Sequence, residues 1–129
     1  MNADVTTDFE GAARLTDWGV IRAAGAEAAS FLQSQLTQDV LGLDAQRATL
    51  AGWCSAKGRL LASFVVWRPA PDDVLLACSA DVLPAVLKRL SMFVLRAKAR
   101  VTDVSDAWTT YAVLGAGAAH YLSDAGLAV

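Results

Sequence analysis

The sequence contains a single histidine, His120, and only two cysteines, Cys54 and Cys78, among its 129 residues. One histidine excludes a histidine-based catalytic triad and a metal site built from several histidines within this chain. The two cysteines form no CxxC motif and have no histidine at a metal-ligand spacing. We therefore expect two buried free thiols, as is usual for proteins of a reducing compartment.

Long apolar runs and a basic leader are also missing. No segment of the sequence approaches the roughly 18 uninterrupted apolar residues that a membrane-spanning helix requires. Near the N-terminus stand Asp4, Asp8 and Glu10, where a secretory signal peptide would carry cations. These observations predict a cytoplasmic protein that does not contact a membrane.

Charge is scarce overall but unevenly distributed. Charged residues make up 19% of the chain against 55% hydrophobic residues, and the net charge is −2, which argues against a surface devoted entirely to nucleic acid. Between residues 57 and 100, however, eight lysines and arginines face three aspartates, a local balance of +5. This basic half fits an anionic ligand or an RNA backbone, and it equally fits solvated helix and strand faces.

Apolar periodicity predicts an α+β fold. Residues 1–13 lack any period and are expected to be a disordered lead-in, followed by one domain over residues 14–129. The predicted elements are a strand over 17–23, a helix from 26, strands over 47–52, 60–67 and 74–78, a helix after residue 81, strands over 98–104 and 108–114, and a short helix over 116–122. This order predicts an antiparallel sheet with helices packed on one face, of ferredoxin-like type.

Three local features refine that prediction. Residues 60–67 are apolar on both faces, so this strand should lie inside the sheet and not at its edge. Asp81 is a suitable N-cap for the second helix, with Pro84 tolerated in its first turn. Gly115–His120 follows a strand and opens a helix, which suits either a tight turn or, more weakly, a dinucleotide-binding loop.

The segment Trp53-Cys54-Ser55-Ala56-Lys57-Gly58-Arg59 lies between two of these strands and is expected to form a hairpin tip. Gly58 suits the positive φ that such tips often need. Lys57 and Arg59 then stand on either side of the glycine beside exposed backbone N–H groups, which favours an anion. The alternative is that both cations are simply solvated.

Several segments together resemble a known family. They are Asp17–Ile21, Phe31–Val40, Cys54–Arg59, Leu90–Arg100 and Leu114-Gly115. In this order, from about residue 15 to 126, they resemble the YgfZ-type tetrahydrofolate-binding proteins, which are cousins of the glycine-cleavage aminomethyltransferase (T-protein). Family members are longer and carry a Lys-Gly-Cys-x-x-Gly-Gln-Glu signature in their second half, whereas here Lys57-Gly58 is followed by Arg59. The resemblance implies the N-terminal part of a family member, truncated before its C-terminal half.

The resemblance further implies a tetrahydrofolate-binding accessory protein in iron–sulfur cluster assembly or repair, linked to tRNA modification. The expected cofactor is tetrahydrofolate or another reduced folate, and iron–sulfur enzymes are the implied clients; direct contact with tRNA stays open. A pterin needs an apolar wall with polar groups at its edge. We expect the folate to contact eight residues: Gln35, Thr37, Asp39, Trp53, Lys57, Gly58, Arg59 and Ser63. Among them, Lys57 and Arg59 are suited to the anionic glutamate tail.

Ser63 separates the two cousins. The resemblance implies that Ser63 stands where the aminomethyltransferases carry a catalytic aspartate, and a hydroxyl does not readily serve as a general base near neutral pH. We therefore expect no methylene-transfer chemistry, although folate binding survives the change. Two other readings remain: an aminomethyltransferase-like enzyme whose acid comes from elsewhere, and an RNA-binding module that uses the basic half.

Overall fold

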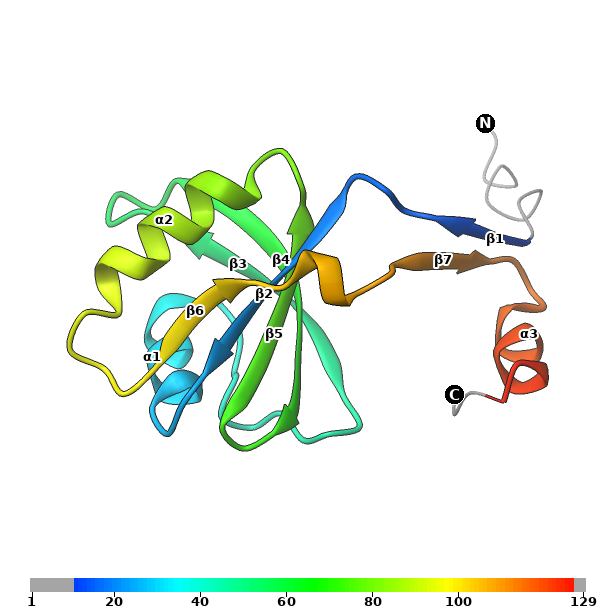
Figure 1. The fold of residues 1–129 in the computed structure, drawn as a ribbon, viewed down its shortest axis with the longest axis horizontal. Coiled ribbons are helices and arrows are strands. Elements are labelled where there is room, and N and C mark those ends of the chain that lie inside the picture. Colours follow the sequence, from blue (N-terminus) through cyan, green and yellow to red (C-terminus); the bar gives the residue numbers. More distant parts are fainter. Residues whose placement is uncertain (1–10, 127–129) are drawn as a thin grey trace. The chain divides into compact units, whose positions relative to one another are not determined.

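The computed structural model describes residues 11–126, which divide into two compact units. The larger unit comprises Asp17–Trp108, and the smaller one contains the described residues before and after it. Figure 1 shows both units along the chain. No helix of the described part is long and apolar enough to cross a membrane.

The larger unit is built on a five-stranded antiparallel sheet in the order β3-β4-β5-β2-β6. Its elements are β2 (Trp18–Ala24), α1 (Ala28–Gln35), β3 (Ala48–Cys54), β4 (Leu60–Ala70), β5 (Asp73–Ser79), α2 (Leu83–Phe93), β6 (Arg100–Asp103) and a short 3-10 turn, Ser105–Ala107. Strand β4 lies between β3 and β5, which confirms that the segment with two apolar faces is internal.

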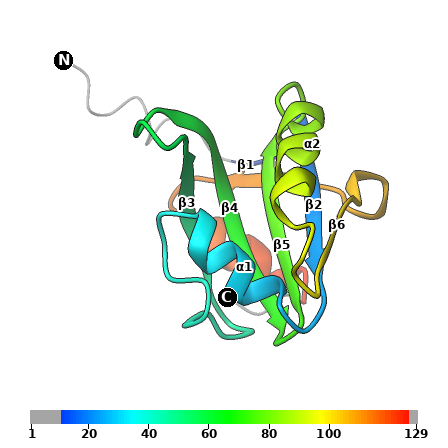
Figure 2. The same cartoon turned by 90° about the vertical axis from the view of Figure 1, so that its left-hand side faces the viewer.

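Both helices of this unit cover the same face of the sheet (Figure 2). Because alternate residues of a strand point to opposite faces, Phe64 and Val66 of β4 join Leu32 of α1 and Leu90 of α2 in the main core. The other face carries a smaller cluster around Val20, Leu75 and Ala77. On this second face no helix of the larger unit packs, and the edge-on pair of Trp67 and Trp108, 5.4 Å between ring centroids, covers part of it. The predicted α+β fold with helices on one face is therefore confirmed.

The smaller unit pairs two strands that lie far apart in the sequence. Strand β1 (Gly11–Arg14) is antiparallel to β7 (Tyr111–Leu114), and helix α3 (Ala118–Asp124) follows. Residues 11–13 were predicted to belong to the lead-in, so its boundary is wrong there; residues 1–10 lie outside the described residues. The reason is physical: the partner of β1 lies about a hundred residues away, and local periodicity carries no trace of it.

The structure also tests the predicted N-cap of the second helix and the loop before the last helix. Asp81 is not the N-cap of α2: that residue is Val82, and the Asp81 carboxylate accepts a hydrogen bond from the Ser79 hydroxyl instead. Pro84 does lie in the first turn. The loop before α3 is a tight strand-to-helix turn, and β7 pairs only antiparallel within the described chain, so a parallel βαβ dinucleotide unit is not formed there.

Candidate functional site

The β3–β4 hairpin ends in a tight turn held by its own backbone. The Ser55 amide donates to the Arg59 carbonyl at 2.8 Å, and the Gly58 amide donates to the Ser55 carbonyl at 2.9 Å. Gly58 has φ = 80°, the positive value that the sequence predicted for this position. Lys57 and Arg59 are therefore presented on a defined turn, both exposed to solvent.

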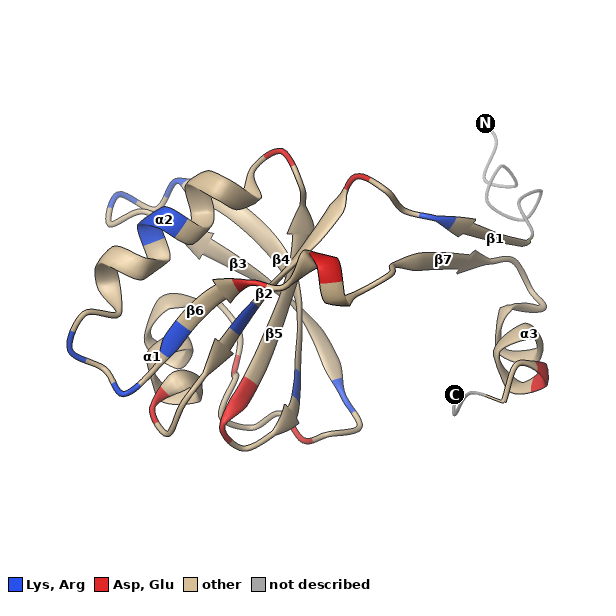
Figure 3. Cartoon of the chain, viewed as in Figure 1, with Lys and Arg blue, Asp and Glu red and all other residues tan. Residues whose placement is uncertain are grey.

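A hollow of about 560 Å³ adjoins this turn, and we call it the tip hollow. It is lined by Ser55, Lys57, Gly58, Arg59, Leu61 and Arg89. Three cations from two elements thus converge on one space, since Arg89 comes from α2. None of the three forms an ion pair within residues 11–126. Figure 3 shows blue segments on α2 and on the hairpin loop and no red segment on either, so the hollow favours an anion.

A second hollow, the tryptophan hollow, lies deeper between the hairpin and α2 and measures about 260 Å³. It is lined by Gln35, Trp53, Cys54, Ser55, Ala56, Leu61, Arg89 and Phe93. Trp53 is only 2% exposed and forms a rigid wall. Its indole N–H donates to Gln35 Oε1 at 3.2 Å, and the Arg89 guanidinium lies 6.0 Å from its ring centroid, where a cation–π attraction is favourable.

Ser63 alternates with Ala62 and Phe64 of the main core, so it lies on the face of the sheet that neither α1 nor α2 covers, and it is exposed. It lines the serine hollow, of about 300 Å³, together with Trp18, Leu60, Leu61, Ala62, Ser79 and Val82. Leu61 lines all three hollows, so they meet around one side chain. Ser63 lies in β4 and Arg59 directly precedes that strand, so the two are four residues apart, a span of at most about 13 Å at the rise of a β-strand.

Thr37 and Asp39 are committed to the backbone. Thr37 Oγ1 accepts the Gly52 amide at 2.8 Å, and the Thr37 amide donates to the Gly52 carbonyl, which ties the end of α1 to β3. Asp39 Oδ1 accepts the Gly42 amide at 3.0 Å. Neither residue lines any of the three hollows. The structure therefore brings Lys57, Gly58 and Arg59 together, joins them to Trp53 and Gln35, and leaves Thr37 and Asp39 apart.

The sequence did not single out Arg89 and Phe93. Arg89 was counted only among the cations of the basic half, and Phe93 only as part of the apolar stripe of the second helix. Phe93 packs edge-on against Trp53, with 6.3 Å between ring centroids and an interplanar angle of 89°. The available signal was their spacing, because residues i and i+4 of a helix share one face.

The two cysteines differ in burial. Cys54 is half-buried and lines the tryptophan hollow, whereas Cys78 is buried in the core. Burial, with smaller contributions from Asp103 and Asp81, raises the pKa of Cys78 from 9.0 to about 11. The described residues contain no group of three or more His, Cys, Asp or Glu that could hold a metal ion.

A thiol-specific reagent at pH 8 should therefore modify Cys54 alone in the folded protein and both cysteines in guanidinium. The raised pKa of Cys78 lowers its thiolate fraction roughly a hundredfold, and burial blocks access as well. The reaction is followed by thiolate release, with Cys54→Ser as the control that should remove the fast phase. Equal rates for both thiols in the native state would contradict the buried position of Cys78.

Comparison with known proteins gives a consistent set of similarities. The model of the GCVT N-terminal domain family matches residues 11–126. The tRNA-modifying protein YgfZ of Sodalis glossinidius is 32% identical over 93 residues, covering 72% of this chain and 28% of that protein. The iron–sulfur cluster assembly factor IBA57 homolog, mitochondrial, of Mycosarcoma maydis is 31% identical over 115 residues, covering 80% of this chain and 28% of that protein. The chain thus spans less than a third of the length of either relative.

A solved structure shares the fold. The glycine cleavage system aminomethyltransferase T from Bartonella henselae superposes with a TM-score of 0.85, over 96% of this chain and 34% of that one, at 22% sequence identity. At this identity the match establishes the arrangement of helices and strands. What binds in the hollows has to be argued from the residues that line them.

Proposed function

The chain belongs to the GCVT N-terminal domain family, and on that premise we propose that it binds a reduced folate as part of an accessory protein of iron–sulfur cluster assembly or repair, with a link to tRNA modification. The names of two relatives support the two halves of this role: one is a tRNA-modifying protein and the other an iron–sulfur cluster assembly factor. Tetrahydrofolate is the folate form that we propose.

One observation carries the folate proposal: Lys57, Arg59 and Arg89 line a single hollow beside the apolar side chain of Leu61. A folate is an aromatic ring system joined to a tail of carboxylates, so it needs an apolar surface at one end and cations at the other. Arginine suits the tail in particular, because its guanidinium binds a carboxylate through two parallel hydrogen bonds. Gly58 adds to this by letting the ligand approach the backbone.

We place the ring system along β4 in the direction of Ser63. The span of at most about 13 Å between Ser63 and Arg59 is of the size needed for a ring system and its benzoyl linker. Ser63 offers a hydroxyl group to a ring edge in the serine hollow, Ser79 offers a hydroxyl oxygen that can accept there while its proton goes to Asp81, and Trp18 offers an apolar wall. Gln35 and Trp53, from our original prediction, serve as a fixed support behind the hairpin, because the indole N–H and the Gln35 carbonyl already satisfy each other.

The proposed role is binding and not methylene transfer. A serine hydroxyl at the position of the cousins' catalytic aspartate leaves no carboxylate on this part of β4 to act on folate nitrogens.

We further propose iron–sulfur enzymes as clients and the cytoplasm as the site of action. The second point is supported by two cysteines that are both free thiols.

Calorimetric titration of this chain with tetrahydrofolate tests the proposal. We expect weak, saturable binding with a Kd above about 10 µM, because this chain matches less than a third of either relative, whose remaining residues can complete the site. Tetrahydropteroic acid, which lacks the glutamate, is the matched control and should bind more weakly still. No saturable heat at millimolar folate would contradict the proposed site, and equal affinity for both compounds would contradict the role of the cations.

A further inference from the structure

The outer side of α2 and the loop after it form an exposed surface of mixed apolar and basic character. We define the α2 patch as Lys88, Arg89, Met92, Phe93, Leu95 and Arg96. Its apolar members are unusually open to solvent for their size: Met92 is 62% exposed, Phe93 54% and Leu95 83%. The inner side of the same helix already packs in the main core, where Leu83, Val86 and Leu90 are buried.

These exposed residues are contiguous. Scattered apolar side chains are normal on protein surfaces, whereas three large ones within four residues form a contiguous apolar patch of the kind that marks interaction sites. Ala85, Lys88, Arg89, Met92 and Phe93 also line a hollow of about 310 Å³. They are spaced by three and four residues on α2, so they form a stripe along one side of the helix.

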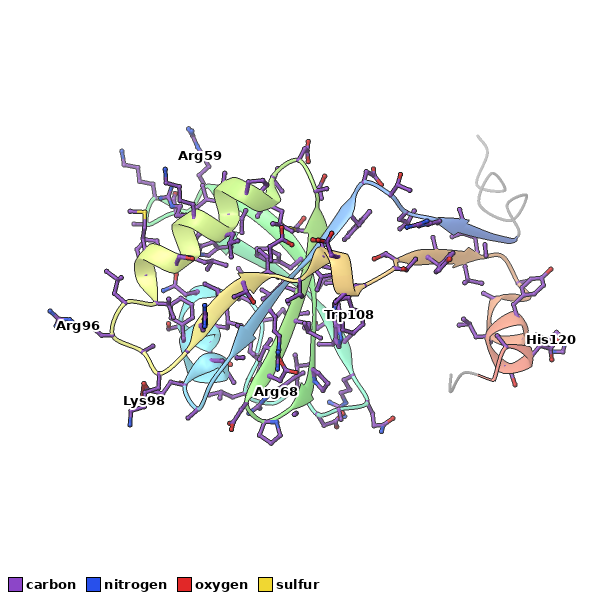
Figure 4. All side chains as sticks on the ribbon, viewed as in Figure 1. Arg59, Arg68, Arg96, Lys98, Trp108 and His120 are labelled. Atoms are coloured by element: carbon purple, nitrogen blue, oxygen red, sulfur yellow. The ribbon has the colours of Figure 1, made fainter. Side chains whose placement is uncertain are left out.

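The charged residues of the α2 patch are all cations. Lys88, Arg89 and Arg96 form no ion pair within residues 11–126. Helix α2 carries blue segments and no red ones in Figure 3, and Arg96 extends away from the ribbon in Figure 4. A partner that covers the α2 patch therefore has to bring apolar side chains for its exposed apolar residues and carboxylates for the cations beside them.

We infer that the α2 patch is a docking site for a partner protein, which binds through a segment that carries acidic side chains next to apolar ones. An RNA strand fits less well, because two of the three apolar side chains, Met92 and Leu95, are aliphatic and offer no stacking surface for bases. The patch shares Arg89 and Phe93 with the hollows around Leu61, but the inference is tested at Met92 and Leu95, which the folate proposal does not use. Met92 and Leu95 line none of the three hollows around Leu61.

The probe is a fluorescein-labelled amphipathic peptide of about 18 residues, with leucines at i, i+3, i+4 and i+7, glutamates beside the leucines and alanines elsewhere, so that it can form a helix. Its binding to the chain is measured by fluorescence anisotropy. Met92→Glu/Leu95→Glu should weaken binding at least about tenfold, because the variant removes the apolar contact and repels the glutamates. The matched control is Leu50→Glu, on β3, since Leu50 is 72% exposed but lies outside the patch. Equal thermal midpoints for the three proteins ensure that folding is unchanged.

Three results would overturn the inference. The first is no binding of the acidic peptide, and the second is equal loss in the Leu50→Glu control. The third is preferential binding of oligouridylate or of phosphatidylglycerol vesicles through the same residues, which would assign the patch to RNA or to a lipid surface. Binding of the acidic peptide that falls with Met92→Glu/Leu95→Glu and that high salt weakens without abolishing would support it, because apolar contact persists when charge is screened.

Discussion

Replacing Lys57 and Arg59 together by alanine is expected to remove most of the preference for a polyglutamylated tetrahydrofolate over the monoglutamate. Both side chains line the tip hollow, and each charge-assisted contact contributes roughly 1–3 kcal/mol, with the lower end apt for exposed groups. Two lost contacts correspond to a drop of about 30-fold or more in affinity for the polyglutamate. Calorimetric titration with the two ligands gives both affinities.

The control for this experiment is Arg96→Ala/Lys98→Ala, which removes the same charge from outside the tip hollow. Both side chains extend away from the ribbon (Figure 4). This variant should keep the preference for the polyglutamate. An equal loss of affinity for both ligands in Lys57→Ala/Arg59→Ala would instead indicate that these cations contact the ring system. Unchanged affinities would show that they are not part of the site.

Gly25→Ala is expected to destabilise the larger unit by about 2–5 kcal/mol, a large share of the stability of a small domain. Gly25 has φ = 134°, and a Cβ there would lie 2.3 Å from the backbone carbonyl oxygen of Lys98. The two backbone segments are held together next to this point, because the Glu27 amide donates to the Lys98 carbonyl and the Lys98 amide donates to Glu27 Oε1. A methyl group at residue 25 would therefore clash with the Lys98 carbonyl, which cannot move away without disturbing these hydrogen bonds.

Gly58→Ala is the matched control for that substitution. Gly58 also has a positive φ, but a Cβ there meets nothing within 4 Å, so only the backbone strain of about 1 kcal/mol remains. Urea unfolding followed by circular dichroism measures both variants. Equal losses for the two glycines would show that the close approach at Lys98 does not govern the stability of this unit.

The helices and inner strands could be predicted from the sequence because their apolar residues recur at the short, regular spacing of a helix or a strand. The run that became β4 is apolar on both faces, and the stripe of α2 returns every three to four residues, so period and burial agree. Strand β1 could not be predicted, because Gly11–Arg14 depends on a partner strand at Tyr111–Leu114. The boundary between two units is set by such distant contacts. The assignment of residues 14–129 to one domain that lacks a C-terminal half stays a prediction.

The same distinction holds for the candidate site. Lys57, Gly58 and Arg59 are neighbours in one turn, so their joint presentation follows from local chemistry. From the sequence, the side-chain oxygens of Thr37 and Asp39 could be expected to bind a ligand. In the folded chain, both accept hydrogen bonds from backbone amides instead. Arg89 and Phe93 were missed because only the packing of α2 brings them to the hairpin, with Phe93 edge-on to Trp53. Local sequence shows which groups are available, whereas tertiary packing decides which of them reach a ligand.

The most direct test of the folate site is amide NMR shift mapping of this chain during titration with tetrahydrofolate, since NMR detects weak binding. We predict that the perturbed amides cluster in Ser55–Ser63 and at Arg89, around the tip and serine hollows. Amides of the Asp39–Gly42 turn and of Leu50 should stay unchanged. Shifts concentrated instead at the separate hollow lined by Leu43, Asp44, Ala45, Arg68, Pro69, Ala70 and Pro71, or no saturable shifts at all, would contradict a folate site at the β3–β4 hairpin.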